Sequence, residues 1–230
     1  MDLPIVIALF VVALTIVVLF FLKRRKNNRR DVLLVGLVDA GKTVLFTQLA
    51  YNKSFTTQTS IKENVADFPV LNKANLKLVD IPGQERIRSK HLDQYKANAR
   101  GVVFVIDAVS FFKQVRDVAE WFYTLLTDQT IASACPRVLV FCNKQDDPVA
   151  KGKSLIQSQL EKEMNVLRET RSNQLQGTSD LANNNSFLGK RGQDFQFSHL
   201  GPIKVEFVEG NVQGSQPAIQ PVINWIQALA

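Results

Sequence analysis

Eight consecutive residues near the start of the chain have the spacing of a phosphate-binding loop. The stretch from Gly36 to Thr43 reads G-L-V-D-A-G-K-T and fits the pattern G-x-x-x-x-G-K-[S/T]. Its two glycines let the backbone approach a phosphate closely, so that successive N–H groups can point at phosphate oxygens. Lys42 adds a positive charge for the β and γ phosphates, and the Thr43 hydroxyl is a suitable Mg²⁺ ligand. The loop predicts binding of a nucleoside triphosphate without specifying the base.

A second motif, Asn143-Lys144-Gln145-Asp146, predicts which base is bound. It directly follows the apolar run 138–142, which is typical of a buried strand. Ligands of open α/β sheets bind at the carboxyl ends of the strands, where this motif would lie. The Asp146 carboxylate can accept hydrogen bonds from both N1–H and the 2-amino group of guanine, a pair that adenine does not present. The motif therefore predicts GTP and GDP as ligands.

A third motif, Asp80-Ile81-Pro82-Gly83, ends another predicted strand, and together the three resemble the motifs of Ras-like small GTPases. The resemblance implies that Lys144 lies along the base and that Asn143 ties its loop to the phosphate loop. It also implies that Asp80 holds Mg²⁺ through water and that the Gly83 N–H meets the γ-phosphate. A glycine there allows close approach, so GTP can order the segment and GDP release it.

Gln84 is the predicted catalytic residue, because Ras-like enzymes orient the attacking water from this position. The competing interpretation is an ordinary polar residue that begins the helix predicted from Glu85 to Lys96. Arg86 and Arg88 are interpreted as solvated residues of that helix, so that no arginine is assigned to stabilise the transition state. Turnover without a partner or activator is expected to be slow.

Two further contacts are expected from the resemblance. A threonine or serine before Asp80 should sense Mg²⁺ and the γ-phosphate; Thr59 is preferred and Ser60 is the alternative. Residues 209–213 stand where the superfamily usually has S-A-K, and there the backbone N–H of Val212 would contact guanine O6 without the help of a lysine. The predicted nucleotide contacts are Gly36, Asp39, Ala40, Gly41, Lys42, Thr43, Val44, Thr59, Gly83, Asn143, Lys144, Asp146 and Val212. The predicted Mg²⁺ ligands are Thr43, Thr59 and Asp80.

Alternating strands and helices must position these motifs. Apolar runs predict buried strands at 32–35, 76–79, 102–106, 138–142 and 205–208, with helices predicted at 111–126, 153–167 and in the final stretch from Ile219. The expected fold is α/β, a Ras-like P-loop GTPase with a mostly parallel six-stranded sheet and helices on both faces. A polar stretch at about 170–192 is interpreted as a flexible insertion.

The net charge of +7 does not indicate nucleic acid binding. Six of the basic residues lie between Lys23 and Arg30, whereas from Asp31 onward 22 basic residues face 20 acidic ones. Cys135 and Cys142 are interpreted as reduced thiols, and no His or Cys cluster has the spacing of metal ligands.

The amino-terminal segment has the composition of a membrane anchor. Residues 3–22 are almost entirely apolar and match the ~20 residues that a helix needs to cross a bilayer. A cleaved signal peptide is less consistent, since its apolar region is usually ~7–15 residues after a positive start. The basic residues that follow predict a cytosolic orientation for the rest of the chain. The expected organisation is a short lumenal end at 1–2, a transmembrane helix at 3–22, a basic linker at 23–30 and a GTPase domain at 31–230.

The complete set of features resembles the beta subunit of the signal recognition particle receptor. The resemblance rests on the anchor, G-L-V-D-A-G-K-T, T-Q-T-S-I, D-I-P-G-Q-E-R-I-R, N-K-Q-D and the polar insertion with its exit. It implies an endoplasmic reticulum location, GTP-dependent binding of the receptor's alpha subunit, and a role in delivering ribosomes that make secretory proteins, with contact to ribosome or translocon. Two alternatives are an Arf- or Sar-like trafficking GTPase, and a scaffold that keeps GTP without cycling.

Overall fold

The computed structural model describes residues 10–18, 29–53, 60–70, 75–134, 137–176, 188–214 and 217–230. Six strands form one sheet in the order β2-β3-β1-β4-β5-β6. All neighbours pair in parallel except β2, which runs antiparallel to β3 at one edge. The predicted mostly parallel, six-stranded sheet is confirmed. The strands are β1 (Asp31–Val35), β2 (Asn64–Phe68), β3 (Leu76–Asp80), β4 (Ala99–Asp107), β5 (Arg137–Asn143) and β6 (Val205–Glu209).

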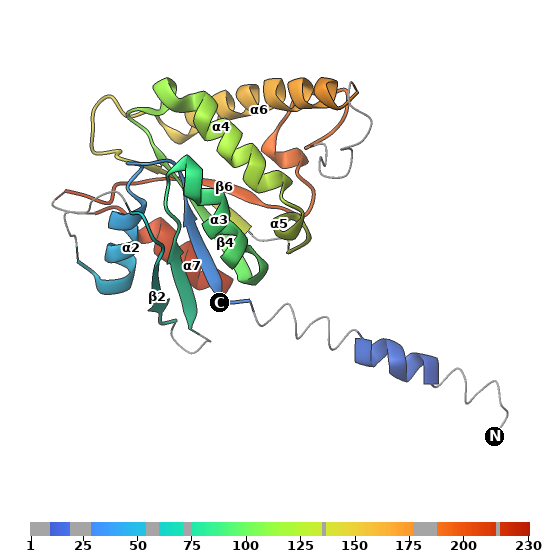
Figure 1. Ribbon diagram of the computed structural model, residues 1–230. Coiled ribbons are helices and arrows are strands. Elements are labelled where there is room, and N and C mark those ends of the chain that lie inside the picture. Colours follow the sequence, from blue (N-terminus) through green and yellow to red (C-terminus); the bar gives the residue numbers. More distant parts are fainter. Residues whose placement is uncertain are drawn as a thin grey trace.

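Helices cover both faces of the sheet, as Figure 1 shows. They are α2 (Lys42–Tyr51), α3 (Glu85–Tyr95), α4 (Phe111–Thr127), α5 (Gln129–Ala134), α6 (Lys153–Gln176) and α7 (Gln220–Leu229), with 3₁₀ turns η1 (Lys96–Asn98) and η2 (Phe197–His199). Side chains of β4 alternate between two cores, because successive strand residues point to opposite faces. Phe104 packs in the core with Trp121 of α4 and Met164 of α6, whereas Val105 packs in the core with Phe46 of α2 and Trp225 of α7.

The long helix α6 corrects the predicted start of the polar insertion. Ile156, Leu160 and Met164 are fully buried as their spacing predicted, but the helix continues past Leu167 to Gln176. Beyond Leu167 the helix makes its contacts through polar residues. The apolar periodicity therefore stops before the helix does, and the predicted end of the helix was too early. Arg171 lies over the Tyr123 ring at 4.7 Å and pairs with Glu120 of α4.

A buried arginine of α6 fixes the chain where it returns to the domain. The Arg168 guanidinium donates to the carbonyl oxygens of Leu188, Lys190 and Gln193. Two other α6 side chains, Asn165 and Glu161, accept hydrogen bonds from the backbone N–H groups of the aromatic residues Phe195 and Phe197. Residues 188–197 are thereby tied to the helix, while the rest of the predicted insertion, 177–187, lies outside the described residues.

Parts of the amino-terminal prediction also fall outside the described residues. Of the predicted span 3–22, residues 10–18 are described; they are helical and their side chains are exposed. Within the described part of the chain, no helix is both long enough and apolar enough to cross a membrane. Cys135 and most of the linker at 23–30 lie outside the described residues, whereas Cys142 is a buried free thiol.

Candidate guanine nucleotide site

The three sequence motifs meet in one pocket at the carboxyl end of the sheet, with a volume of ≈ 270 Å³. This is near the lower end of the ~300–1,000 Å³ usual for ligand sites. The fold brings the motifs together because β1, β3 and β5 end at the same edge of the sheet. The described residues that line the pocket are Val38, Asp39, Gly41, Lys42, Thr43, Val44, Ser60, Ile81, Pro82, Gly83, Asn143, Lys144, Asp146, Asp147, Val212 and Gln213.

The phosphate loop between β1 and α2 has a backbone that requires its glycines. Gly36 has φ 149° and Gly41 has φ 95°, and between them Asp39 has φ 60°. A Cβ on Gly36 would overlap the carbonyl oxygen of Val105, and one on Gly41 would overlap the Asn143 amide. Repeated left-handed residues curl the backbone into the kind of concave turn that binds anions.

Lys42 lies at the bottom of this loop and is only 6% exposed. Its Nζ donates to the carbonyl oxygen of Leu37 at 2.6 Å. Burial lowers the pKa of Lys42 to about 8, although the carboxylates of Asp80 and Asp39 act in the opposite direction. The buried ammonium group is therefore the main positive charge lining the phosphate loop.

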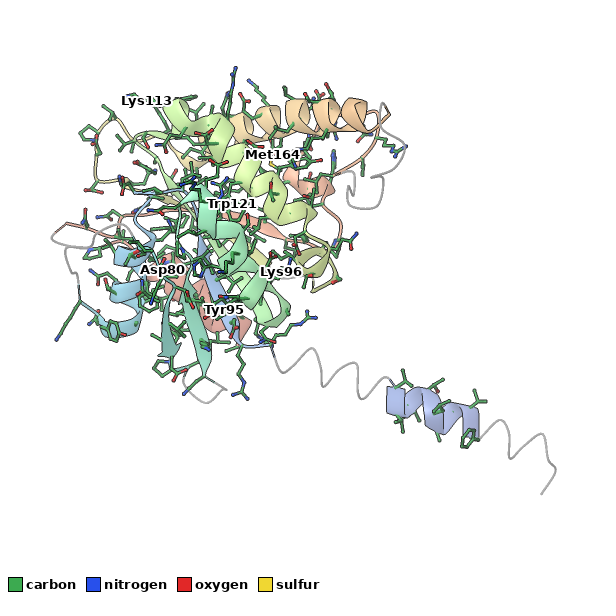
Figure 2. The ribbon with its side chains drawn as sticks, viewed as in Figure 1. Asp80, Tyr95, Lys96, Lys113, Trp121 and Met164 are labelled. Carbon is green, nitrogen blue, oxygen red and sulfur yellow. The ribbon has the colours of Figure 1, made fainter. Side chains whose placement is uncertain are left out.

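Asp80, labelled in Figure 2, ends β3 and is hydrogen-bonded to side chains of α2 and β2. The Thr43 hydroxyl donates to Asp80 Oδ2 at 2.8 Å and lies 3.0 Å from the Ser60 hydroxyl. The Asn64 amide donates to the same Oδ2 at 3.0 Å. Burial raises the pKa of Asp80, and the hydrogen bonds from Asn64 and Thr43 and the charge of Lys42 oppose that rise.

These oxygens suit a hard divalent cation. Asp80 Oδ1 is buried and has no hydrogen-bond partner within the described part of the chain. A buried carboxylate that accepts from the Thr43 hydroxyl, with the Ser60 hydroxyl 3.0 Å from that of Thr43, matches the oxygen ligands that Mg²⁺ prefers. Of the two hydroxyl residues predicted for this place, Ser60 lines the pocket, while Thr59 lies outside the described residues.

The segment after β3 packs directly against the phosphate loop. A Cβ on Gly83 would come within 2.7 Å of backbone atoms of Leu37 and Val38 and of Lys42 Nζ, so that only glycine fits. The next residue, Gln84, is exposed and does not line the pocket; its carbonyl oxygen accepts from the N–H of Arg88 at 2.9 Å as α3 begins.

Arg88 was predicted to be solvated, but its side chain is half-buried. Its guanidinium lies 4.5 Å from the centre of the Trp121 ring, and burial lowers its pKa. Arg86 is exposed, in agreement with the prediction.

Asn143 joins three segments at the other end of the pocket and is fully buried. Its amide nitrogen donates to the carbonyl oxygen of Ala40 at 2.8 Å, and its amide oxygen accepts from the Val212 N–H at 3.1 Å. The predicted tie between this loop and the phosphate loop is present in the structure. The backbone N–H of Val212 was predicted to meet guanine O6, but in the structure it donates to Asn143. The neighbouring residue, Gln213, also lines the pocket.

Lys144 is held beside the pocket by an acidic residue that sequence reasoning missed. Its Nζ lies 2.8 Å from Asp107 Oδ2, at the end of β4. Asp107 Oδ1 accepts from the N–H groups of Val109 and Ser110. Burial alone would raise the pKa of Asp107, but the hydrogen bonds from Lys144 and Ser110 outweigh it and the pKa is lowered. A charged residue at the carboxyl end of a buried strand was a signal that could have identified Asp107.

Comparison with known proteins agrees with this geometry. The family model described as signal recognition particle receptor beta subunit matches residues 27–205. A relative from Mus musculus, signal recognition particle receptor subunit beta, is 42% identical over 235 aligned residues, which cover 99% of this chain and 87% of the relative.

Two solved structures share the fold. One, "The Structure of the Mammalian SRP Receptor", is similar with a TM-score of 0.77 and 43% identity, covering 87% of this chain and 100% of that chain. The other, "Signal recognition particle receptor SRb-GTP/SRX complex from Chaetomium thermophilum", has a TM-score of 0.70 at 22% identity, over 86% of this chain and 99% of that chain, and shows likeness of fold alone. On its sequence, its fold and its pocket, the chain belongs to the family of signal recognition particle receptor beta subunits, which are small GTPases.

Proposed function

We propose that the chain is the membrane-anchored, GTP-binding subunit of a signal recognition particle receptor at the endoplasmic reticulum. In its GTP-bound state it binds the alpha subunit and supports co-translational targeting of secretory proteins. The observation that carries the proposal is the pocket lined jointly by the phosphate loop, the Asp80–Gly83 segment and the Asn143–Asp146 motif.

Each end of the pocket has its own part in recognition. Asp146 selects guanine, and Lys144, oriented by Asp107, lies along the base. Lys42 and the backbone of residues 36–43 hold the phosphates. Thr43, Ser60 and Asp80 would hold Mg²⁺, which when bound neutralises charge on the β and γ phosphates. We assign the sensing hydroxyl to Ser60 because its Oγ lies 3.0 Å from Thr43 Oγ1.

Hydrolysis is slow in the isolated chain under this proposal. Gln84 is exposed at the start of α3, and no arginine is present among the described residues that line the pocket. Arg88 is engaged with Trp121. A movement of the segment, or a residue supplied by a partner, would be needed to complete the catalytic arrangement.

The partner proposal draws on the relatives. The Chaetomium thermophilum structure is that of an SRb-GTP/SRX complex, and the Mus musculus relative is named as a subunit. The same role brings the chain close to the ribosome or the translocon. A pull-down of the alpha subunit with the full chain loaded with GTP or GDP tests the nucleotide dependence directly, and equal recovery in both states contradicts it.

The membrane proposal draws on composition. Residues 3–22 are apolar over the length of a bilayer span and are followed by six basic residues, which favours a single pass with a cytosolic domain. The test is a carbonate wash of membranes that contain the chain. Retention in the pellet supports a spanning segment, and release into the supernatant contradicts it.

The guanine site is tested with the full chain in detergent. Affinities for GTP, ATP and xanthosine triphosphate are measured with Mg²⁺ for the natural sequence and for Asp146→Asn. GTP should bind far more tightly than ATP, and the variant should shift towards the xanthine nucleotide, since the asparagine amide pairs with the 2-oxo group. Equal binding of GTP and ATP would contradict the GTPase assignment.

A second candidate is a scaffold that binds GTP without cycling, favoured by the exposed position of Gln84. Multiple-turnover hydrolysis with and without the alpha subunit separates the two. A hydrolysis rate that is lower in Gln84→Leu than in the natural sequence supports a cycling enzyme. An unchanged, near-zero rate under all conditions supports the scaffold.

A further inference from the structure

Asn64 is the first residue of β2 and lies directly across the antiparallel pair from Asp80. The register joins Asn64 to Asp80, Val65 to Val79 and so on along the two strands. Directly opposite residues of an antiparallel pair have side chains close enough to interact. The Asn64 amide uses this position to donate to Asp80 Oδ2 at 3.0 Å.

The two oxygens of the Asp80 carboxylate have unequal surroundings. Oδ2 accepts from both Asn64 and the Thr43 hydroxyl, at 3.0 and 2.8 Å. Oδ1 is buried and has no hydrogen-bond partner in the described part of the chain. Two donors on one oxygen fix the rotation of the carboxylate plane, because turning it would break both bonds.

The residue before Asn64, Glu63, anchors the beginning of β2 to helix α3. Glu63 Oε2 lies 2.8 Å from His91 Nδ1, and Glu63 Oε1 accepts from the Tyr95 hydroxyl at 3.3 Å. Both partners belong to α3, on which Figure 2 labels Tyr95. The start of β2 is therefore held on one side by α3 and on the other by Asp80.

We propose that Asn64 is a positioning residue for the divalent cation of the nucleotide site: its hydrogen bond to Oδ2 fixes the orientation of the Asp80 carboxylate, which would help to hold the ion. The proposal rests on the proposed guanine nucleotide function. Without this donor the carboxylate turns more freely.

The test measures how much Mg²⁺ is needed to retain a nucleotide. The full chain in detergent is loaded with fluorescent GDP, and retained GDP is followed as free Mg²⁺ is lowered. Asn64→Ala is compared with the natural sequence and with Asn224→Ala, which makes the same change at a position on α7 outside the pocket. Asn64→Val is a second variant, because valine suits a strand and lacks the donor.

A positioning role predicts a selective effect. Both Asn64 variants should need about tenfold more Mg²⁺ for half retention, in line with a hydrogen bond to a charged group. Their affinity for GDP in excess EDTA should stay within about twofold of the natural sequence, and Asn224→Ala should behave as the natural sequence does. An unchanged Mg²⁺ midpoint, or an equal loss of affinity with Mg²⁺ and with EDTA, would overturn the proposal. If the natural sequence itself binds no guanine nucleotide, the proposed function fails instead.

Discussion

The two ends of the nucleotide pocket differ in how their polar groups are satisfied. At the guanine end, Asn143 makes two buried hydrogen bonds and Lys144 is paired with Asp107. At the magnesium end, Asp80 Oδ1 is buried with no partner in the described part of the chain, and Lys42 is a buried ammonium with a lowered pKa. The hydrogen bonds at the guanine end thus stabilise the fold itself. The magnesium end keeps polar groups whose burial is unfavourable until charge is brought to them.

The difference follows from the position of each end in the sheet. The guanine end is built on β4, β5 and the loop after β6, whose parallel pairings join it to the centre of the sheet. The magnesium end is built on β3 and on β2, an edge strand that pairs within the sheet with β3 and not with a second strand. An edge strand has fewer hydrogen bonds to break when it moves. We therefore expect any nucleotide-dependent movement to be larger at the magnesium end than at the guanine end.

Removing Asn143 should have the largest effect on stability. In Asn143→Ala the carbonyl oxygen of Ala40 and the N–H of Val212 lose their buried partner, which costs about 2–4 kcal/mol of unfolding free energy. Denaturant unfolding of the nucleotide-free chain gives the value, with Asn224→Ala as the control. A loss no greater than that of the control would mean that the guanine end is not part of the folding core.

Lys42 should make nucleotide affinity depend on pH. Its pKa is lowered to about 8 by burial, so below this pH the ammonium is charged and available to the phosphates. As pH rises above 8 the free protein loses the proton, and the dissociation constant for GDP should rise up to about tenfold per pH unit.

Titration of GDP affinity from about pH 7 to pH 9 tests this expectation, with Lys42→Met as the comparison. The variant should bind weakly with no rise at alkaline pH, and its nucleotide-free stability should be unchanged or higher, because a buried charge has been removed. If Lys42→Met were much less stable than the natural chain, the buried charge of Lys42 would not be unfavourable, and the two ends of the pocket would not differ in their effect on stability.

Asp107→Asn should have a smaller effect, at the guanine end. The amide keeps an oxygen for the N–H groups of Val109 and Ser110 but loses its charge opposite Lys144. Because Lys144 is more than a third exposed, solvent weakens the pair, and we expect a fall in GDP affinity of about two- to fivefold. Asp117→Asn, an exposed carboxylate on α4, is the matched control. Identical affinities for both variants would show that Asp107 does not orient Lys144.

Tryptophan emission should give the smallest signal and the most local one. Trp121 lies under Arg88 of α3, the helix that follows the Asp80–Gly83 segment, whereas Trp225 lies on α7. Exchange of GDP for a non-hydrolysable GTP analogue should change the emission of Trp225→Phe, which retains Trp121, more than that of Trp121→Phe. The reverse result would place the main nucleotide-dependent change near α7.

Sequence reasoning identified the residues whose chemistry admits few substitutes. Gly41 and Lys42 were predicted because close approach to a phosphate and a charge for the phosphates each require a particular residue type, whereas the role of Asn143 was predicted from the resemblance to Ras-like GTPases. The parallel sheet followed from its buried apolar runs. Asn64 was missed, because its role depends on the register with β3, which a single sequence does not reveal.

Other differences arose where polar residues make contacts that apolar patterns do not mark. The end of α6 was placed too early, since Arg168 and Arg171 continue the packing after Leu167. Arg88 was interpreted as solvated, although its guanidinium packs on an aromatic ring. Long charged side chains that cover apolar surface are hard to distinguish from solvated ones by spacing.

The clamp made by Arg168 has a consequence for how this protein can be altered. Its guanidinium binds three carbonyl oxygens of residues 188–193, so the returning chain is fastened to α6 by contacts that do not involve residues 177–187. Each doubling of a flexible loop costs only about 0.6 kcal/mol in closure entropy. A fluorescent or affinity tag spliced between Gln176 and Leu188 should therefore leave the nucleotide pocket intact, which would allow the protein to be followed in living cells without altering either terminus.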